Sequence, residues 1–422
     1  MTDLVVAGAG PFGLTVARVL AERGRRVTVV ERRDHIGGNA YSSTDPATGV
    51  EIHNYGAHIF HTSNEAVWEF LGRFTAWTGY SHRVFTRHHG EVFPLPINLA
   101  TINQFFRSAL TPDDARALIA EQSGQPEQAR WTGQAGLTKR AGHAGGGDAS
   151  SVAAVRDSAP PAVDGAGTGQ TESGKSLRDK GISLIGRPLY EAFIEAYTAK
   201  QWQTPADQLP ASVINRLPVR YNYDSRYFSD PHQGLPVDGY AALWQRLADH
   251  PRIEIVLGRD FLDDSPDAAN TPSRSSCAGQ APVVFTGPID RYFGHSAGPL
   301  GWRTLDFEWS RPATGDFQGC AVMNYADLDD PWTRIIEFRH FHPERDYPAD
   351  QTVIAREYSR PAAGADEPYY PINTPADRQR LETYRSLAEA EPLVWFGGRL
   401  GRYRYLDMDM AVAAALALAN KL

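Results

Sequence analysis

The chain has few cysteines and no long apolar run. Only Cys277 and Cys320 occur among 422 residues, so at most one disulfide can form and a disulfide framework is excluded. The most apolar stretch, MAVAAALALA, is far shorter than the roughly 20 residues of a membrane span. The opening MTDLVVAGAGPFG lacks the basic region and the cleavage-site pattern of a secretion signal. We therefore expect a cytoplasmic protein without membrane insertion, in which the apolar stretch forms a buried terminal helix.

An excess of basic residues is also missing. Lys and Arg number 42 against 50 Asp and Glu, which gives a formal net charge of -8. The chain therefore has no overall positive field that would hold nucleic acid or an anionic membrane. An anionic ligand would have to be bound by individually placed cations.

The N-terminal segment carries a nucleotide-binding pattern. DLVVA and VTVV predict two buried strands, and GAGPFG between them, with Gly8, Gly10 and Gly13, opens a predicted helix. Glycines in this context let the backbone approach a pyrophosphate, and Glu31 after the second strand can bond ribose hydroxyls. The second glycine pair, in ERRDHIGGNAY, is typical of FAD-binding folds. The pattern favours FAD as cofactor.

Composition divides the chain into three expected domains within an α/β fold. Residues 1–80 plus 380–422 should form a Rossmann-like FAD-binding domain assembled from both chain ends, and residues 81–215 a mostly helical inserted domain. Within the insert, residues 122–176 are rich in Gly, Ala, Ser and Thr and are predicted to be disordered. Residues 216–379 contain several short alternating segments, which predict a mixed or antiparallel β-sheet substrate domain with returns to the FAD domain.

Periodicity predicts the individual elements. Helices are expected over 64–75, 98–121 and 177–202. Strands and turns are expected over 212–230, and strands in IEIVL, PVVFTG, RTLDFEW, CAVMNY, RIIEFRHF, TVIAREY and LVWFGG.

Motifs over nearly the whole chain resemble the UDP-galactopyranose mutase family. They include GNAYSS, YGAHIFHTSN, YTAKQW, LPVRYNYDSRYFSD, FTGPID, GWRTLDFE, DEPYYPIN and FGGRLGRYRYLDM, in the family's order, and only 122–176 falls outside. The resemblance implies a bacterial enzyme of galactofuranose biosynthesis for the cell wall, and a homodimer or larger homo-oligomer. It implies interconversion of UDP-galactopyranose and UDP-galactofuranose by reduced FAD, through a covalent flavin N5–sugar iminium intermediate, with NAD(P)H or another reductant as electron source.

Such chemistry calls for cations rather than a Ser, Cys or His nucleophile, because the flavin attacks C1 of the sugar and UDP departs. By resemblance, Arg216 and Arg334 bind the diphosphate, which a guanidinium fork suits. Arg303 matches a position near the flavin, where it would favour an anionic reduced ring. Arg220 is interpreted as structural.

The resemblance also implies the binding residues. Cofactor contacts are expected from Gly8, Gly10, Pro11, Phe12, Gly13, Glu31, Arg32, Gly38, Asn39, His58, Ile59, Arg399, Leu406, Asp407 and Met408. The uracil is expected to lie on Phe193, Tyr197, Thr198 and Trp202, with Trp202 on a mobile lid. Phosphate or sugar contacts are expected from His82, Tyr227, Asn324, Tyr370 and Tyr405.

The stretch HNYGAHIFH raises the alternative of a metal site, since it packs three histidines into nine positions. No Cys or carboxylate cluster accompanies them, so no metal is expected. Instead, His58 is predicted to face the flavin near N5, with His53 and His61 structural. Small Gly56 and Ala57 would let the backbone approach a planar ring.

Three other functions stay open. Trp332 and Asp409 depart from the family pattern beside functional positions, which leaves room for a deoxy-galactose or pentose nucleotide as substrate. A flavin amine oxidase or related dehydrogenase would share the fold, but an apolar amine needs neither the paired arginines nor the YTAKQW segment. A nucleotide-sugar sensor without catalysis is the third.

Overall fold

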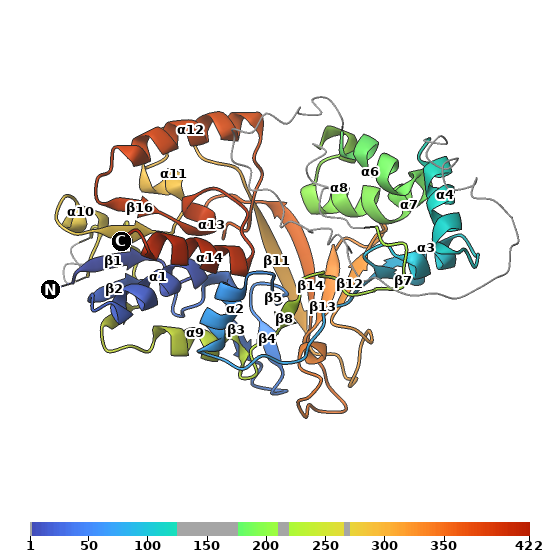
Figure 1. Cartoon of the computed structure of the whole chain (residues 1–422), viewed down its shortest axis with the longest axis horizontal. Helices are drawn as coiled ribbons and strands as arrows, with labels where there is room; N and C mark the ends of the chain where they lie inside the picture. The colour runs from blue at the N-terminus through green and yellow to red at the C-terminus, as the bar shows by residue number, and fades with distance from the viewer. Residues whose placement is uncertain (1, 125–175, 210–218, 266–270) are drawn as a thin grey trace, which may run out of the picture.

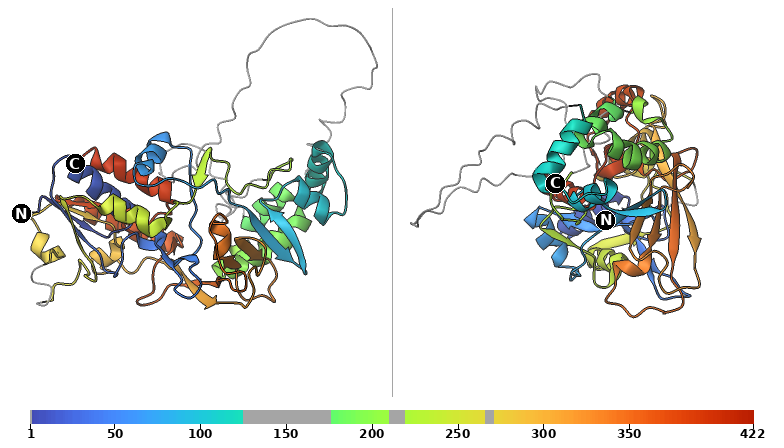
Figure 2. Two further views of the ribbon diagram at one scale, coloured as in Figure 1. Left: turned by 90° about the horizontal axis from the view of Figure 1, so that it is seen from below. Right: turned by 90° about the vertical axis from the view of Figure 1, so that its right-hand side faces the viewer.

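The computed structural model describes residues 2–124, 176–209, 219–265 and 271–422. A five-stranded sheet with its helices lies at one end of the molecule, a seven-stranded sheet stands in the middle, and a group of helices lies at the other end (Figures 1 and 2). Both termini lie at the end with the five-stranded sheet (Figure 1). Arg216 and most of the 122–176 segment fall outside the described residues.

The five-stranded sheet is entirely parallel. Its order is β16 (Val394–Phe396), β10 (Val283–Phe285), β1 (Leu4–Ala7), β2 (Val27–Val30) and β9 (Ile253–Val256). Every residue of β1 and β2 is buried, as expected of a parallel sheet covered on both faces. The predicted strands are confirmed, and β9 and β10 are the segments by which the middle of the chain returns to this sheet.

Two apolar layers cover the sheet. Val6 and Val29 face a core shared with helices α1 (Pro11–Glu22), α9 (Gly239–Ala248) and α14 (Met408–Ala419). On the other face, Val5 and Val283 pack with residues of short helices α10 (Arg274–Cys277) and α11 (Ile289–Tyr292), beside α12 (Pro375–Glu389). Helix α14 contains the apolar stretch predicted to be a buried terminal helix; the helix is confirmed, but only the face with Val412, Ala415 and Ala419 is buried.

The seven-stranded sheet mixes strand directions. Its order is β15 (Tyr370–Pro371), β11 (Trp302–Ser310), β14 (Ile354–Pro361), β13 (Arg334–Glu337), β12 (Val322–Tyr325), β6 (Val84–His88) and β7 (Glu91–Leu95). All pairs are antiparallel except β12 with β6. The sequence analysis assigned no strand to 84–95, yet these residues form a hairpin that completes the sheet. Its turn is made by His89 and Gly90, both at positive φ, as hairpin turns prefer.

The helical group consists of α3 (Leu99–Phe105), α4 (Pro112–Gln122), α6 (Leu177–Ile185), α7 (Arg187–Tyr190), a π-helical turn η2 (Glu191–Glu195) and α8 (Ala196–Trp202). The single helix expected over 98–121 is wrong, because Thr111 caps a new helix that starts with Pro112.

Smaller elements complete the described chain. They are η1 (Gly38–Ala40), α2 (Glu65–Gly72), η3 (Ala206–Gln208), η6 (Phe338–Phe341), α13 (Gly398–Gly401) and two ribbons, β3 (Ser42–Thr44) with β4 (Glu51–His53) and β5 (Phe60–Thr62) with β8 (His232–Gly234). The strands expected over 212–230 are absent from the described part, 219–230, which forms turns. Among the described residues, no helix combines the length and apolarity needed to cross a membrane.

Candidate functional site

A cavity of about 660 Å³ opens where the parallel strands end. Its walls include Ala7, Val30 and Phe285, the last residues of β1, β2 and β10. In open α/β sheets, ligands bind outside the carboxyl ends of the strands. The cavity therefore lies where the fold itself predicts a nucleotide.

Glycines make room in this cavity for a ligand at the start of α1. Gly8 has φ of +110°, and a Cβ there would lie 2.0 Å from Thr286 Oγ1. A Cβ on Gly38 would approach the Gly10 Cα to 3.1 Å, so two backbone segments meet here without side chains. Helix α1 begins at Pro11 with no side-chain cap, which leaves its first amides available to an anion. The turn fits the pyrophosphate of a dinucleotide.

Glu31 is hydrogen-bonded to the same turn. Its carboxylate accepts the Ala9 amide at 2.7 Å and the Arg33 amide at 2.9 Å, and its side chain lines the cavity. Two backbone bonds aim this carboxylate, which stands where a ribose would lie.

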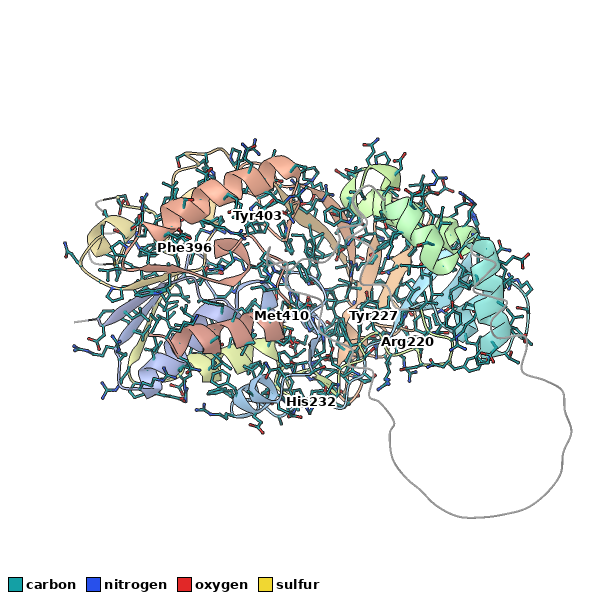
Figure 3. The ribbon with its side chains drawn as sticks, turned by 45° about the horizontal axis from the view of Figure 1, so that its top comes forward. Arg220, Tyr227, His232, Phe396, Tyr403 and Met410 are labelled. Atoms are coloured by element: carbon teal, nitrogen blue, oxygen red, sulfur yellow. The ribbon has the colours of Figure 1, made fainter. Side chains whose placement is uncertain are left out.

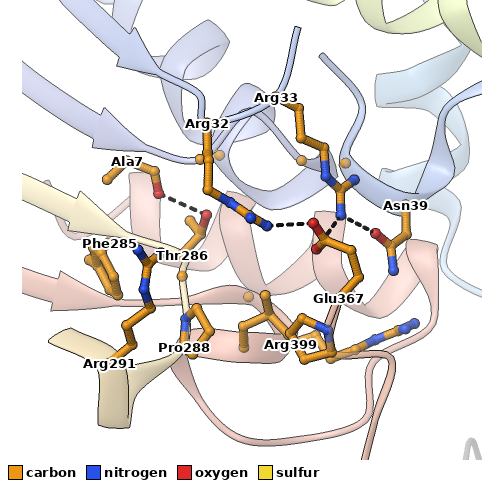
Figure 4. Close-up of a pocket in the computed structure, with 18 of the residues that line it drawn as sticks. Ala7, Arg32, Arg33, Asn39, Phe285, Thr286, Pro288, Arg291, Glu367 and Arg399 are labelled. Carbon is orange, nitrogen blue, oxygen red and sulfur yellow. Dashed lines mark hydrogen bonds and ion pairs between the residues drawn. The ribbon is translucent and has the colours of Figure 1, made fainter. Parts of the chain in front are cut away.

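An ion-pair network joins residues that line the cavity (Figure 4). Glu367 binds Arg32 at 2.5 Å and Arg33 at 2.8 Å, and Arg33 also donates to the Asn39 side chain at 2.7 Å. Burial alone would lower the pKa of Arg33, but Glu367 raises it, so the guanidinium stays charged. The segment 362–368 thus joins a pocket wall that the two chain ends share with residues between 259 and 302.

The C-terminal part of the chain supplies another wall. Arg399 donates to the Tyr369 carbonyl at 3.1 Å and to the Leu406 carbonyl at 2.7 Å. Asp407 is the N-cap residue of α14 and accepts the Tyr405 hydroxyl at 2.8 Å. Leu406, Asp407 and the first residue of α14 line the cavity, so a second helix start faces it.

The histidines of HNYGAHIFH have separate partners. His58 Nδ1 donates to the Gly56 carbonyl at 2.7 Å, while the His58 amide donates to His53 Nδ1 at 3.0 Å. His61 Nδ1 lies 2.7 Å from Asp230. Of the three histidines, only His58 lines the cavity. Burial lowers the pKa of His58 to about 4, so at neutral pH its Nε2 carries no proton.

Gly56 has φ of +94°, and a Cβ there would lie 3.2 Å from the Phe307 ring, so only glycine fits this bend.

Arg334 stands at the centre of a second group of residues, on the seven-stranded sheet. Its Nε lies 3.0 Å from Glu357 Oε1, and the Glu357 side chain is almost fully buried. Desolvation would lower the pKa of Arg334, but Glu357 and the nearby Tyr197 and Tyr370 outweigh it and raise the pKa. A permanently charged guanidinium is therefore held among tyrosines, with about a quarter of its side chain exposed.

Other predicted substrate residues gather around Arg334. Asn324 on β12 pairs with Arg334 on β13, and its buried Oδ1 has no hydrogen-bond partner among the described residues. Burial, followed by Arg334, lowers the pKa of His82 to about 3, so this imidazole is neutral. Burial raises the pKa of Tyr197 to about 12. Tyr227 also raises the pKa of Arg334. It lies beside the central sheet, nearer than Met410 to the helical group (Figure 3).

Tyr370 links this group to the cavity. Its ring stacks on Tyr405 with centroids 5.7 Å apart, and Arg399 lies over both rings. The cavity at the parallel sheet and the group around Arg334 are therefore adjacent.

Helix α8 covers the second group from the helical side. Its last residue, Trp202, has a carbonyl that accepts Arg303 Nη1 at 3.2 Å, and Ser359 donates to the preceding carbonyl at 2.7 Å. Arg303 is 3% exposed and bonds Ser359, and burial lowers its pKa to about 10. It lies behind α8 and is not among the described residues that line the cavity.

Two predicted contacts gain no support from their placement. Phe193 is 3% exposed and packs in an aromatic core with Phe93, centroids 5.0 Å apart, and with Phe105. This packing favours a place for Phe193 in the hydrophobic core over a contact with the uracil base. Ile59 is partly buried against the apolar core and does not line the cavity. Thr198, another residue predicted to contact the uracil, is buried within α8.

The remaining predicted cofactor residues all line the cavity. They are Gly8, Gly10, Pro11, Phe12, Gly13, Glu31, Arg32, Gly38, Asn39, His58, Arg399, Leu406, Asp407 and Met408.

Sequence reasoning missed Glu357 and Glu367. Glu357 follows Arg356 in TVIAREY; adjacent residues of a strand point to opposite faces, so one of these two charges had to face the covered side. Glu367 had no such signal.

Comparisons with known proteins agree with this geometry. Residues 192–405 match the family model of UDP-galactopyranose mutase, and residues 6–74 match an NAD(P)-binding Rossmann-like domain. The chain is 41% identical to a probable UDP-galactopyranose mutase of Klebsiella pneumoniae, over 99% of this chain and 94% of that protein. It is 35% identical to a dTDP-fucopyranose mutase of Escherichia coli, over 97% and 95%. A crystal structure of a reduced UDP-galactopyranose mutase has the same fold, with a TM-score of 0.64 and 14% identity over 100% of this chain and 95% of that one.

Proposed function

The chain belongs to the UDP-galactopyranose mutase family, and we propose that it interconverts UDP-galactopyranose and UDP-galactofuranose with reduced FAD. The resemblance in its motifs is thereby confirmed, and the protein is a flavin-dependent isomerase of this type. The single observation that carries the proposed chemistry is Arg334: a charged guanidinium among tyrosines, next to a cavity shaped for a dinucleotide.

The residues at the cavity fit FAD. The approach of Gly10 and Gly38 leaves space that a Cβ would fill, Glu31 is aimed at a ribose position, and a second helix start at Asp407 lines the cavity. When bound in its reduced form, the flavin supplies the nucleophile for the anomeric carbon of the sugar. The two helix starts and the glycine turn would hold the cofactor, and His58 would present an unprotonated Nε2 to the ring.

Arg334 would bind the diphosphate and stabilise its charge as it leaves the sugar. Charge-assisted bonds from a guanidinium are strong in a site with little water, and they act most where negative charge develops. Glu357 would hold the guanidinium in orientation through its Nε, which leaves the outer fork free for phosphate oxygens. Arg216 would be the second diphosphate cation.

The tyrosines would position the substrate without taking part in proton transfer. Tyr197 keeps its proton well beyond neutral pH, so its hydroxyl can donate to a phosphate oxygen. Tyr370 and Tyr405 would hold the phosphates or sugar at the junction with the cavity, and the unpaired Asn324 would bond a polar group of the ligand.

The test is turnover of a nucleotide sugar by the purified flavoprotein. Protein reduced with dithionite is incubated with UDP-galactofuranose, and the products are separated by chromatography. UDP-galactopyranose should form with reduced protein and not with protein kept oxidised. Absence of conversion by flavin-loaded, reduced protein would refute the proposed reaction.

A second candidate is the same reaction on another sugar nucleotide. The relative from Escherichia coli is named as a dTDP-fucopyranose mutase, and it matches nearly the whole chain. The same assay with dTDP-fucofuranose distinguishes the two. We expect a higher kcat/KM for the UDP-galactose pair, in line with the higher identity to the UDP-galactopyranose mutase relative.

A further inference from the structure

Lys200 makes an unusual set of contacts near the end of α8. Its ammonium nitrogen donates to four backbone carbonyls, those of Tyr325 at 2.6 Å, Asp327 at 2.7 Å, Asp330 at 2.9 Å and Trp332 at 3.1 Å. Tyr325 is the last residue of β12, and the other three residues lie in the connection from β12 to β13. The ammonium is therefore surrounded by one loop of the neighbouring sheet.

The chemistry of this cage requires a compact cation. Four carbonyl oxygens that converge on one point repel one another unless a positive charge lies between them. An ammonium has three protons and no acceptor, and its small size lets it sit inside such a cage, which a planar guanidinium does not match. The conformation of the 325–332 connection therefore depends on Lys200.

The connection is flanked by two residues that we propose bind the substrate. Asn324 precedes it on β12 and Arg334 follows it on β13, and the two residues pair across the strands. A change in the path of the connection would move both ends of that pair. Additional bonds join the connection to the sheet, from the Ala326 amide to the Arg87 carbonyl at 3.0 Å and from His88 to Asp327 at 2.7 Å.

Lys200 also lies on α8, the helix that covers the group around Arg334. Tyr197 and Trp202 belong to α8, whose end is fixed to the sheet through Arg303 and Ser359. Lys200 adds a third attachment, on the side of Arg334. The helix and the β12–β13 connection cannot shift past each other while the ammonium is in place.

We propose that Lys200 is a positioning residue for the reaction: by clasping the 325–332 connection it holds Arg334 and Asn324 at a set distance from Tyr197 on α8. The role rests on the proposed function, since the step that it serves is stabilisation of the departing diphosphate. Lys200 itself has no contact with the substrate, because its three donors are engaged by backbone carbonyls.

The test is a double-mutant cycle between Lys200 and Arg334. Lys200→Met keeps the length and apolar stem of the side chain but removes the cation. We expect its kcat to fall on the order of 10- to 100-fold, because a displacement of about 1 Å can cost that much. Affinity for UDP, measured by titration of the oxidised flavoprotein, should weaken several-fold, while flavin content stays that of the unmodified protein. Lys421→Met, which removes the same charge at an exposed C-terminal residue, should leave all three quantities unchanged.

The cycle separates positioning from general destabilisation. If Lys200 acts through Arg334, the variant with both Lys200→Met and Arg334→Ala should be no slower than Arg334→Ala alone. Effects that multiply in the double variant, or a Lys200→Met turnover within twofold of the unmodified protein, would overturn the proposal. Should Lys200→Met lose its flavin, Lys200→Arg serves in the same cycle, since it keeps the charge but not the compact shape.

The UDP titration also distinguishes the two hypotheses. If the unmodified protein binds UDP but isomerises no nucleotide sugar, the proposed reaction is refuted. The effect of Lys200→Met on UDP affinity then still shows whether Lys200 is a positioning residue.

Discussion

Nε of Arg334 lies 3.0 Å from Oε1 of Glu357, a carboxylate that is almost fully buried in the adjacent strand. The pair fixes the one described cation that stands among Tyr197, Tyr227 and Tyr370. An arginine held by a buried carboxylate suits the diphosphate-binding role that we propose for it.

Replacement of Arg334 should affect turnover rather than cofactor binding. Arg334→Ala is expected to lower kcat/KM by roughly 100-fold or more, as removal of a charge-stabilising donor does. Flavin absorbance should persist, because Arg334 is not among the described residues that line the cavity. Arg334→Lys, which keeps the charge without the fork, should recover only part of the activity. Turnover within twofold of the unmodified protein in Arg334→Ala would contradict the role given to this residue.

Gly8 is predicted to be essential for cofactor retention. In Gly8→Ala the new Cβ would lie 2.0 Å from Thr286 Oγ1 at φ of +110°, and the turn must open. The purified variant should contain little flavin, judged by absorbance per chain. Gly24→Ala is the matched control, because Gly24 has φ of +93° but no atom within 4 Å of the new Cβ. Flavin content in Gly8→Ala equal to that of Gly24→Ala would contradict this prediction.

His58 should stay neutral throughout the physiological pH range. Burial in the cavity wall lowers its pKa to about 4, despite the hydrogen bond to the Gly56 carbonyl. Between about pH 5.5 and 8 its charge is constant, so the shape of the kcat/KM profile should be the same in His58→Phe even if the absolute rate changes. A limb with a midpoint near the ordinary value for histidine that disappears in His58→Phe would contradict this assignment.

Asp45 should contribute to acid resistance. A hydrogen bond from Arg311, with others from Thr48, lowers the pKa of the buried Asp45 carboxyl to about 2. A carboxyl whose pKa is depressed by folding stabilises the protein above its unfolded pKa, and the contribution is lost as pH falls from about 4 to about 2. Asp45→Asn should therefore lower the free energy of unfolding by about 1 kcal/mol at pH 7, a figure reduced for solvent around the half-exposed Arg311.

The difference between Asp45→Asn and the unmodified protein should shrink toward zero below about pH 3, as measured by urea unfolding. A difference that stays constant from pH 7 to pH 3 would show that packing, and not charge, accounts for the effect.

Local patterns were enough to predict part of this structure. Strands β1 and β2 follow continuous apolar runs, and the turn at Gly8 follows a motif whose spacing is itself the constraint. The hairpin of β6 and β7 escaped prediction although alternation and the His89–Gly90 turn were present, because it lies in a region whose composition favoured helices. Phe193 shows the opposite error, since its spacing along the helix cannot distinguish an aromatic core from a ligand contact.

By itself the sequence determined the first two strands of the nucleotide sheet with their glycine turn, the α/β class and the family, because apolar runs, glycine spacing and shared motifs are written in neighbouring residues. Only the tertiary structure decided that Glu367 pairs with Arg32 and Arg33 in the wall of the cavity, and that Lys200 is held by backbone carbonyls. Every residue has a backbone carbonyl, so the residue types along the chain do not indicate where several carbonyl oxygens converge. Contacts of this kind exist only after distant segments have packed against one another.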